Sequence, residues 1–198
     1  MQVGYDQQLK NPAWRRTILF LPKFNGDFIN LSRSFQPGGF LMFTYKKSDN
    51  MKYYFAFYYN RECFGDYFLP LLGIDWKINS HMNLFGDLPN NLSFEFKISP
   101  AMTLGIGFIM TISSFRVHQE DATSYIREGN NILGHDQLKV YLNYFLTEHF
   151  IVYAEAGQTF NRKYIGYDSD NNIVPSSSIK TYDGMFATGG LAYRFVLE

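Results

Sequence analysis

Hydrophobic and polar residues alternate with a period of two through most of the chain. In residues 91–98 every even-numbered position is apolar and every odd-numbered position is polar. Such a pattern predicts a β-strand whose two faces meet different surroundings. The same alternation recurs in residues 72–79, 137–147, 150–157 and 190–197, and less regular strands are predicted at 15–21, 40–46 and 51–60. No stretch has the 3.6-residue period of an amphipathic helix.

Residues 98–115 contain no charged side chain and approach the length of a transmembrane helix. The dipeptide Ser99-Pro100 is a turn signal, and residues 103–108 alternate small or polar side chains with large apolar ones. A long strand through a nonpolar medium therefore explains this segment better than a helix.

The connections between predicted strands alternate between tight turns and long polar segments. Tight turns are predicted at 47–50, 79–80, 99–101 and 147–148, and long segments at 22–38, 61–67, 116–136 and 161–184. Strict alternation also requires a short strand at 81–86, followed by a connection at 87–90 on the long-loop side. The pattern predicts an all-β fold, an antiparallel up-and-down transmembrane β-barrel of about ten strands, within a range of about 8 to 12, with both termini periplasmic. We expect this barrel to be a single domain over residues 1–198.

Composition excludes several classes of protein. The chain has 18 basic and 18 acidic residues, so its net charge is zero, and only 18% of its residues are charged. This balance excludes a disordered acidic tail and a polybasic segment, and we expect no nucleic-acid partner. The single cysteine, Cys63, cannot form an internal disulfide and has no second cysteine with which to share a zinc ion.

The two faces of the predicted strands decide between lipid and water outside the sheet. The apolar faces of the clearest strands carry no charged residue, which both a membrane and a dry protein core would enforce. The opposite face is more informative, because the odd-numbered positions from 103 to 113 are uncharged and, apart from Ile109, small, and Asp75 and Lys77 lie close together with opposite sign. Such a face suits a crowded, narrow lumen. We expect a charge network in this lumen, formed by Asp75, Lys77, Glu95, Lys97, Lys139, Glu155 and Arg194.

Tyrosines near the predicted strand ends favour an interfacial aromatic girdle, although tyrosine also has a high β-propensity. These residues are Tyr53, Tyr54, Tyr58, Tyr59, Tyr141, Tyr144 and Tyr153.

Three short motifs follow one another between residues 68 and 108. They are Pro70-Leu71-Leu72-Gly73-Ile74-Asp75-Trp76, then Leu88-Pro89, then Leu104-Gly105-Ile106-Gly107. In this order they resemble a family of uncharacterised outer-membrane β-barrel proteins of Gram-negative bacteria, a domain of unknown function. The resemblance implies export, folding by the barrel-assembly machinery and no catalytic residues. The sequence departs from the family in two ways. It ends with Val196-Leu197-Glu198 instead of an aromatic residue, and it shows no signal peptide, so we expect the N-terminal part to be incomplete.

Candidate catalytic and metal-binding residues are sparse, and we expect no enzymatic activity, no cofactor and no metal site. A lipid hydrolase or acyltransferase would need a serine, a histidine and an acid, and the nearest such group is Ser113, Ser114, His118 and Glu120. The four histidines, His81, His118, His135 and His149, are dispersed. The segment with Asp168, Asp170, Asn171 and Asn172 resembles a calcium loop in composition but lacks the glycine and distal glutamate of an EF-hand.

We therefore expect an outer-membrane barrel in contact with outer-membrane lipid, with a largely filled polar lumen and a structural, binding or small-solute passage role. Because a barrel of about ten strands leaves little free lumen, the interior charges favour a structural network over a wide pathway. Two alternatives remain open. One is a soluble β-barrel that binds an apolar ligand inside, and the other is the lipid-modifying enzyme.

Overall fold

The computed structural model describes residues 3–26, 34–119, 122–128, 135–168, 170, 172–175 and 179–194. Its main element is an eleven-stranded sheet in which every pairing is antiparallel. No helical segment of the described ranges is long and apolar enough to cross a bilayer. The fold is thus all-β and antiparallel, as the alternation predicted.

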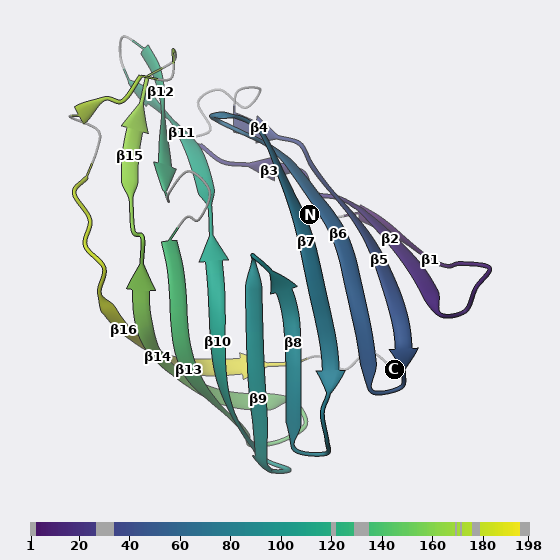
Figure 1. Ribbon diagram of the computed structural model, residues 1–198. Coiled ribbons are helices and arrows are strands. Elements are labelled where there is room, and N and C mark those ends of the chain that lie inside the picture. The colour runs from purple at the N-terminus through teal and green to yellow at the C-terminus, as the bar shows by residue number, and fades with distance from the viewer. Residues whose placement is uncertain are drawn as a thin grey trace.

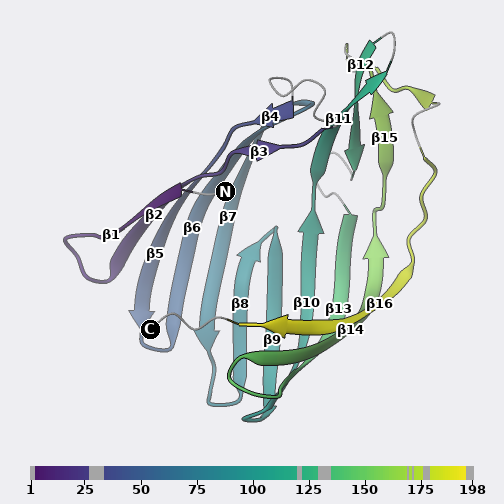
Figure 2. The same cartoon turned by 180° about the vertical axis from the view of Figure 1, so that it is seen from behind.

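The strands of the main sheet follow one another in chain order, so each pairs with its predecessor and its successor. In sheet order they are β1 (Val3–Gln8), β2 (Trp14–Phe20), β5 (Gly38–Ser48), β6 (Met51–Glu62), β7 (Gly65–Lys77), β8 (Met82–Leu88), β9 (Asn91–Ser99), β10 (Met102–Thr111), β13 (His135–Phe145), β14 (Phe150–Phe160) and β16 (Met185–Tyr193). The sheet curls strongly (Figures 1 and 2), which gives it a convex and a concave face. No pairing joins β1 to β16 among the described residues, so the sheet is open there.

Two smaller sheets lie at the upper end of the main one in Figure 1. One pairs β3 (Lys23–Phe24) with β4 (Phe35–Gln36), and the other contains β11 (Ser113–Gln119), β12 (Ala122–Glu128) and β15 (Tyr164–Tyr167). They are formed by the long connections, which therefore gather at one end of the sheet. We call it the long-loop end, and the opposite end the tight-turn end.

Side chains in the tight turns explain why the chain reverses there. Asn79 Oδ1 accepts hydrogen bonds from the backbone N–H groups of His81 and Met82, both at 2.8 Å. Thr147 Oγ1 accepts one from the backbone N–H of Phe150 at 3.0 Å. Short polar side chains of this kind replace backbone partners in turns.

The main sheet differs from the expected strand plan in three places. β16 begins at Met185, five residues before the expected strand at 190–197. Residues 61–67 do not form a long connection, because β6 and β7 run on and only residues 63–64 separate them. An additional strand, β1, pairs with β2, which makes the number of strands odd. The described chain therefore begins at the long-loop end and β16 ends at the tight-turn end, and the expectation that both termini lie at one end is not met.

Strand parity separates the side chains as the sequence predicted. Large apolar side chains on the convex face are widely exposed, for example Leu72 at 65%, Val140 at 50% and Leu191 at 71% of their surface. Ala56 and Leu71 on the concave face are buried. The expected tyrosine girdle is divided by the same parity, because Tyr53, Tyr59 and Tyr144 lie on the convex face while Tyr54, Tyr58, Tyr141 and Tyr153 lie on the concave face.

Candidate functional site

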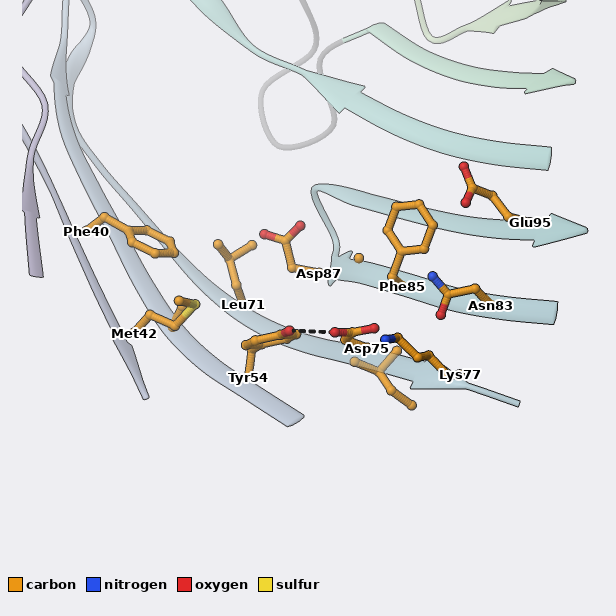
Figure 3. A pocket seen from close by; sticks show the side chains of 13 residues that line it. Phe40, Met42, Tyr54, Leu71, Asp75, Lys77, Asn83, Phe85, Asp87 and Glu95 are labelled. Atoms are coloured by element: carbon orange, nitrogen blue, oxygen red, sulfur yellow. Dashed lines mark hydrogen bonds between the residues drawn. The ribbon is translucent and has the colours of Figure 1, made fainter. Parts of the chain in front are cut away.

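The concave face holds an open hollow of about 630 Å³ between β5 and β9. Its wall combines apolar side chains with polar and charged ones, and Figure 3 shows both kinds pointing into the same space. The side chains that define its chemistry are Phe40, Met42, Leu71, Phe85, Tyr54, Asn83, Asp75, Lys77, Asp87 and Glu95. A hollow with an apolar wall and a few polar groups is typical of sites that hold small molecules.

Asp75 takes its partners from the neighbouring strand. Lys52 Nζ lies 3.5 Å from Asp75 Oδ2, and the hydroxyl of Tyr54 donates a hydrogen bond to the same oxygen at 3.4 Å. Lys52 is directly opposite Asp75 in the register of β6 and β7. The Cβ atoms of opposite residues lie about 5 Å apart, closer than those of residues two positions apart on one strand. Asp75 therefore pairs with Lys52 on β6 and not with Lys77 on its own strand.

Glu95 is bound by a tyrosine two strands away. The hydroxyl of Tyr141 on β13 donates to Glu95 Oε1 at 2.9 Å, crossing the intervening strand β10. Its ring lies over Gly105, where an added Cβ would come within 2.2 Å of the ring. Glycine at this position is therefore required for the Tyr141 to Glu95 contact.

Lys139 and Glu155 form the closest ion pair on the concave face among the described contacts. Lys139 Nζ lies 2.5 Å from Glu155 Oε2, and only 17% and 22% of the two side chains are exposed. Lys139 also lies 5.9 Å from the centre of the Tyr141 ring. The side chains of β13 and β14 thus form one connected polar patch with Glu95.

Arg194 and Lys97 lie away from these pairs, toward the tight-turn end. Arg194 Nη2 donates to the backbone carbonyl of Glu148 at 3.1 Å, and both basic residues line a separate cavity of about 520 Å³. No ion pair of Lys77, Lys97 or Arg194 occurs within the described ranges. Of the seven residues expected in one network, the structure thus brings together Glu95, Lys139 and Glu155 through Tyr141, and it places Asp75 in a second group with Lys52.

A buried polar cluster at the long-loop end was not predicted from the sequence. Ser114 Oγ donates to Glu62 Oε2 at 2.5 Å and accepts from the backbone N–H of Cys63 at 3.0 Å. Asn60 donates to the other oxygen of Glu62, and Lys23 Nζ lies 3.7 Å from it. Asn60 and Glu62 share the inward parity of β6, which is the signal that could have found them; the partner Ser114, on β11, could not be inferred.

Ser114 is also a member of the candidate catalytic group of the sequence analysis, and its environment does not suit a nucleophile. Its side chain is fully buried, and its hydroxyl donates to Glu62 instead of to a histidine. His118 lies on β11 opposite Thr123, and Glu120 falls outside the described residues. The buried hydroxyl of Ser114 does not face a surface that substrate could reach, and Ser113 stays an untested hypothesis.

We expected no metal site at the four histidines or at the acidic loop. No group of three or more His, Cys, Asp or Glu side chains suited to a metal occurs among the described residues. His81 Nδ1 shares a hydrogen bond with Ser80 Oγ, and His149 Nδ1 lies 3.1 Å from the carbonyl oxygen of Arg194. The side chains of His118 and His135 lie outside the description.

Asp168 uses its carboxylate to hold its own loop. Asp168 Oδ1 accepts hydrogen bonds from the backbone N–H groups of Asp170 at 2.9 Å and Asn172 at 2.8 Å. The bond from the Asn172 N–H is the main cause that lowers the pKa of Asp168 below its ordinary value. These bonds give Asp168 a structural role in the turn of this loop. Asn171 lies outside the described residues.

The sequence matches no protein-family model and no curated protein. Among solved structures the chain is similar to the NanC porin, with 11% sequence identity, coverage of 98% of each chain and a TM-score of 0.43. A likeness of this degree carries no functional argument, so the function is argued below from the faces of the sheet.

Proposed function

We propose that this protein is an outer-membrane β-barrel whose convex face meets lipid and whose polar concave face lines a narrow lumen for small polar solutes. The strands of the main sheet form most of the wall of such a barrel. The long-loop end would face the cell exterior and the tight-turn end the periplasm, as in other barrels of this class.

The distribution of charge on the convex face carries the proposal. By strand parity, the described charged residues of this face lie near strand ends: Arg16 at the tight-turn end, and Arg61, Asp66 and Asp136 at the long-loop end. Lys47, at the irregular end of β5, lies over the ring of Tyr53 on the same face. Between these ends the face is apolar from β1 to β16, with many exposed phenylalanine, leucine and isoleucine side chains. Soluble proteins rarely expose a continuous apolar surface of more than a few hundred Å². A hydrocarbon surrounding stabilises such a band and excludes charge from it.

The same parity argues against a soluble barrel that binds an apolar ligand. Such a barrel would turn its apolar faces inward and its charged faces to water. Here Val140 is half exposed, whereas the adjacent Lys139 pairs with Glu155 on the concave side. The arrangement of the two faces is the reverse of what the soluble alternative requires.

Tyrosine rings that lie along the inner wall support passage or binding of solutes. Tyr141 extends over Gly105, and a Cβ at Gly190 would come within 2.7 Å of the Tyr153 hydroxyl. Rings held against the wall leave part of the lumen unfilled, and Tyr54, whose ring lies against Gly73, lines the hollow of about 630 Å³. Only small solutes fit, because wide aqueous channels need barrels of about 16 strands.

Reconstitution tests both parts of the proposal. The purified protein is refolded in detergent, transferred to phospholipid vesicles and washed at alkaline pH. We expect it to stay with the vesicles and to admit sugars and amino acids at rates that fall steeply with solute size. Recovery in the aqueous fraction without detergent would contradict the membrane assignment, and tight but impermeable vesicles would leave only a structural role.

A further inference from the structure

We propose that Arg16 binds the phosphate of an anionic membrane phospholipid at the tight-turn end of the convex face, beside the rings of Trp14 and Tyr45. The inference rests on the proposed function, because it requires the convex face to lie in a bilayer. It adds a lipid-binding site with a stated chemistry, which the apolar band alone does not imply.

Two consecutive arginines of β2 point to opposite faces of the sheet. Arg15 lies on the concave side, where its Nη1 is 2.9 Å from Asp6 Oδ2. Arg16 lies opposite Gln7 of β1 and Phe43 of β5 on the convex side. Each arginine therefore meets a different medium although the two are adjacent in sequence.

Arg16 has no anionic partner among the described residues. Its Nη2 donates to the neutral side-chain oxygen of Gln7 at 2.6 Å, and its Nε is enclosed without an acceptor. The nearest carboxylate on these strands, Asp6, is on the other face and is bound by Arg15 and by Thr17 Oγ1. The guanidinium thus keeps its charge and unused donors on a face that is otherwise apolar.

The surroundings of Arg16 place it at the depth of lipid headgroups. Arg16 is two residues from Trp14, where β2 begins after the turn at 9–13. Trp14 packs on Tyr45 with ring centres 4.9 Å apart and on Phe55 at 6.4 Å. Tryptophan and tyrosine favour the boundary between headgroups and acyl chains, and a lipid-facing arginine costs little there but about 2–4 kcal/mol at the midplane.

A phospholipid fits both parts of this site, which are the guanidinium of Arg16 and the exposed apolar side chains next to it. The planar guanidinium can donate two parallel hydrogen bonds to phosphate oxygens. Directly beyond Arg16 on the same strand, Ile18 and Phe20 expose 43% and 51% of their surface and offer contact to acyl chains. Free phosphate would contact only the guanidinium and not the apolar side chains, so the geometry favours a lipid phosphate.

The two tryptophans of the chain allow a direct test. In a Trp76→Phe variant Trp14 is the remaining tryptophan, and its fluorescence is quenched by brominated acyl chains next to it. The protein is reconstituted into phosphatidylcholine vesicles that contain the same fraction of brominated phosphatidylglycerol or of brominated phosphatidylcholine. We expect the apparent association of phosphatidylglycerol at Trp14 to be about fivefold stronger than that of phosphatidylcholine.

Matched variants assign the preference to Arg16. Arg16→Gln should abolish the preference, Arg16→Lys should retain part of it, and Arg15→Gln on the concave face should leave it unchanged. Equal quenching by both lipids in the parent protein, or an unchanged preference in Arg16→Gln, would overturn the inference. So would loss of the preference on addition of inorganic phosphate at constant ionic strength, because it would indicate a water-filled anion site. Absence of quenching by either lipid would instead refute the membrane assignment itself.

Discussion

At the scale of single residues, the concave face repeats one arrangement of tyrosine and glycine. The Tyr141 ring lies over Gly105, and a Cβ at Gly73 would come within 2.9 Å of the Tyr54 ring. Both tyrosines donate to a carboxylate, Glu95 in one case and Asp75 in the other. Glycine removes the Cβ that would push the ring away from the concave face, so the hydroxyl reaches an acid along that face.

Tyr141→Phe tests the value of this arrangement. The substitution keeps the ring and removes the donor to Glu95, so we expect the free energy of unfolding in detergent micelles to fall by about 1–3 kcal/mol. Urea titration followed by tryptophan fluorescence measures the change. Tyr5→Phe, at a side chain that is 57% exposed on the convex face, is the control and should change stability by less than about 0.5 kcal/mol. Equal losses in the two variants would contradict a role for the Glu95 contact.

The Asp168 loop gives a pH-dependent prediction. Because the folded pKa of Asp168 lies below its value in an unfolded chain, about 3.9, the carboxylate stabilises the loop above that pH. The contribution is lost as the pH falls through the folded pKa. The carboxyl ¹³C shift of Asp168 should therefore titrate at a lower pH in the protein than in an unstructured peptide of the same segment. Asn172→Pro, which removes the backbone donor, should raise the midpoint; identical midpoints would refute the assignment.

At the scale of strands, parity alone fixes which side chains face outward. In β9, Phe94 lies opposite Leu84 and Ile106, whereas Ser93 lies opposite Phe85 and Gly107. A shift of one residue would exchange the two sets, so the alternation and the tight turns together specify the register.

Phe94→Arg and Ser93→Arg form a matched pair that tests this parity in the membrane. Arginine at position 94 would face the acyl chains, and we expect insertion to be destabilised by about 2–4 kcal/mol. Arginine at position 93 would lie on the polar concave face near Glu95, and it should leave insertion largely intact. The folded fraction in vesicles is measured by the gel mobility of unheated samples. A stronger defect for Ser93→Arg would show that the faces have been assigned the wrong way round.

At the scale of the whole molecule, the long loops are fixed to the sheet by the buried polar cluster. Ser114 binds Glu62 across 52 positions of sequence, and Gln36 Nε2 donates to the carbonyl of Ser114 across 78. These bonds connect β4, β6 and β11. Because buried polar groups without partners are costly, the cluster is expected to open as a unit.

Cys63 reports on that opening. The side chain is buried in the folded protein and its backbone N–H donates to Ser114 Oγ. We expect Ser114→Ala to leave Glu62 without one of its donors and to raise the rate of maleimide labelling of Cys63 about tenfold. The neighbouring Ser113→Ala is the control and should leave the rate near that of the parent protein. An unchanged rate in Ser114→Ala would indicate that the loops are held by other contacts.

The sequence by itself determined most strands of the main sheet, their two faces and the order of their hairpins, because strand periodicity and turn chemistry depend on residues within a few positions of one another. It did not predict the two smaller sheets, whose strands β3, β4, β12 and β15 lie in the long polar connections. It also placed Glu95, Lys139 and Glu155 on one face. It missed β1, since residues 3–8 carry polar side chains on both faces and become a strand only by pairing with β2.

Tertiary structure alone decided which inward charges meet. Lys52 pairs with Asp75, Tyr141 reaches Glu95 across β10, and Ser114 binds Glu62 from a distant loop. These contacts depend on the register between strands and on the curvature of the sheet, which no local pattern encodes. Each strand's sequence therefore specifies a face, whereas the assembled sheet specifies the partner.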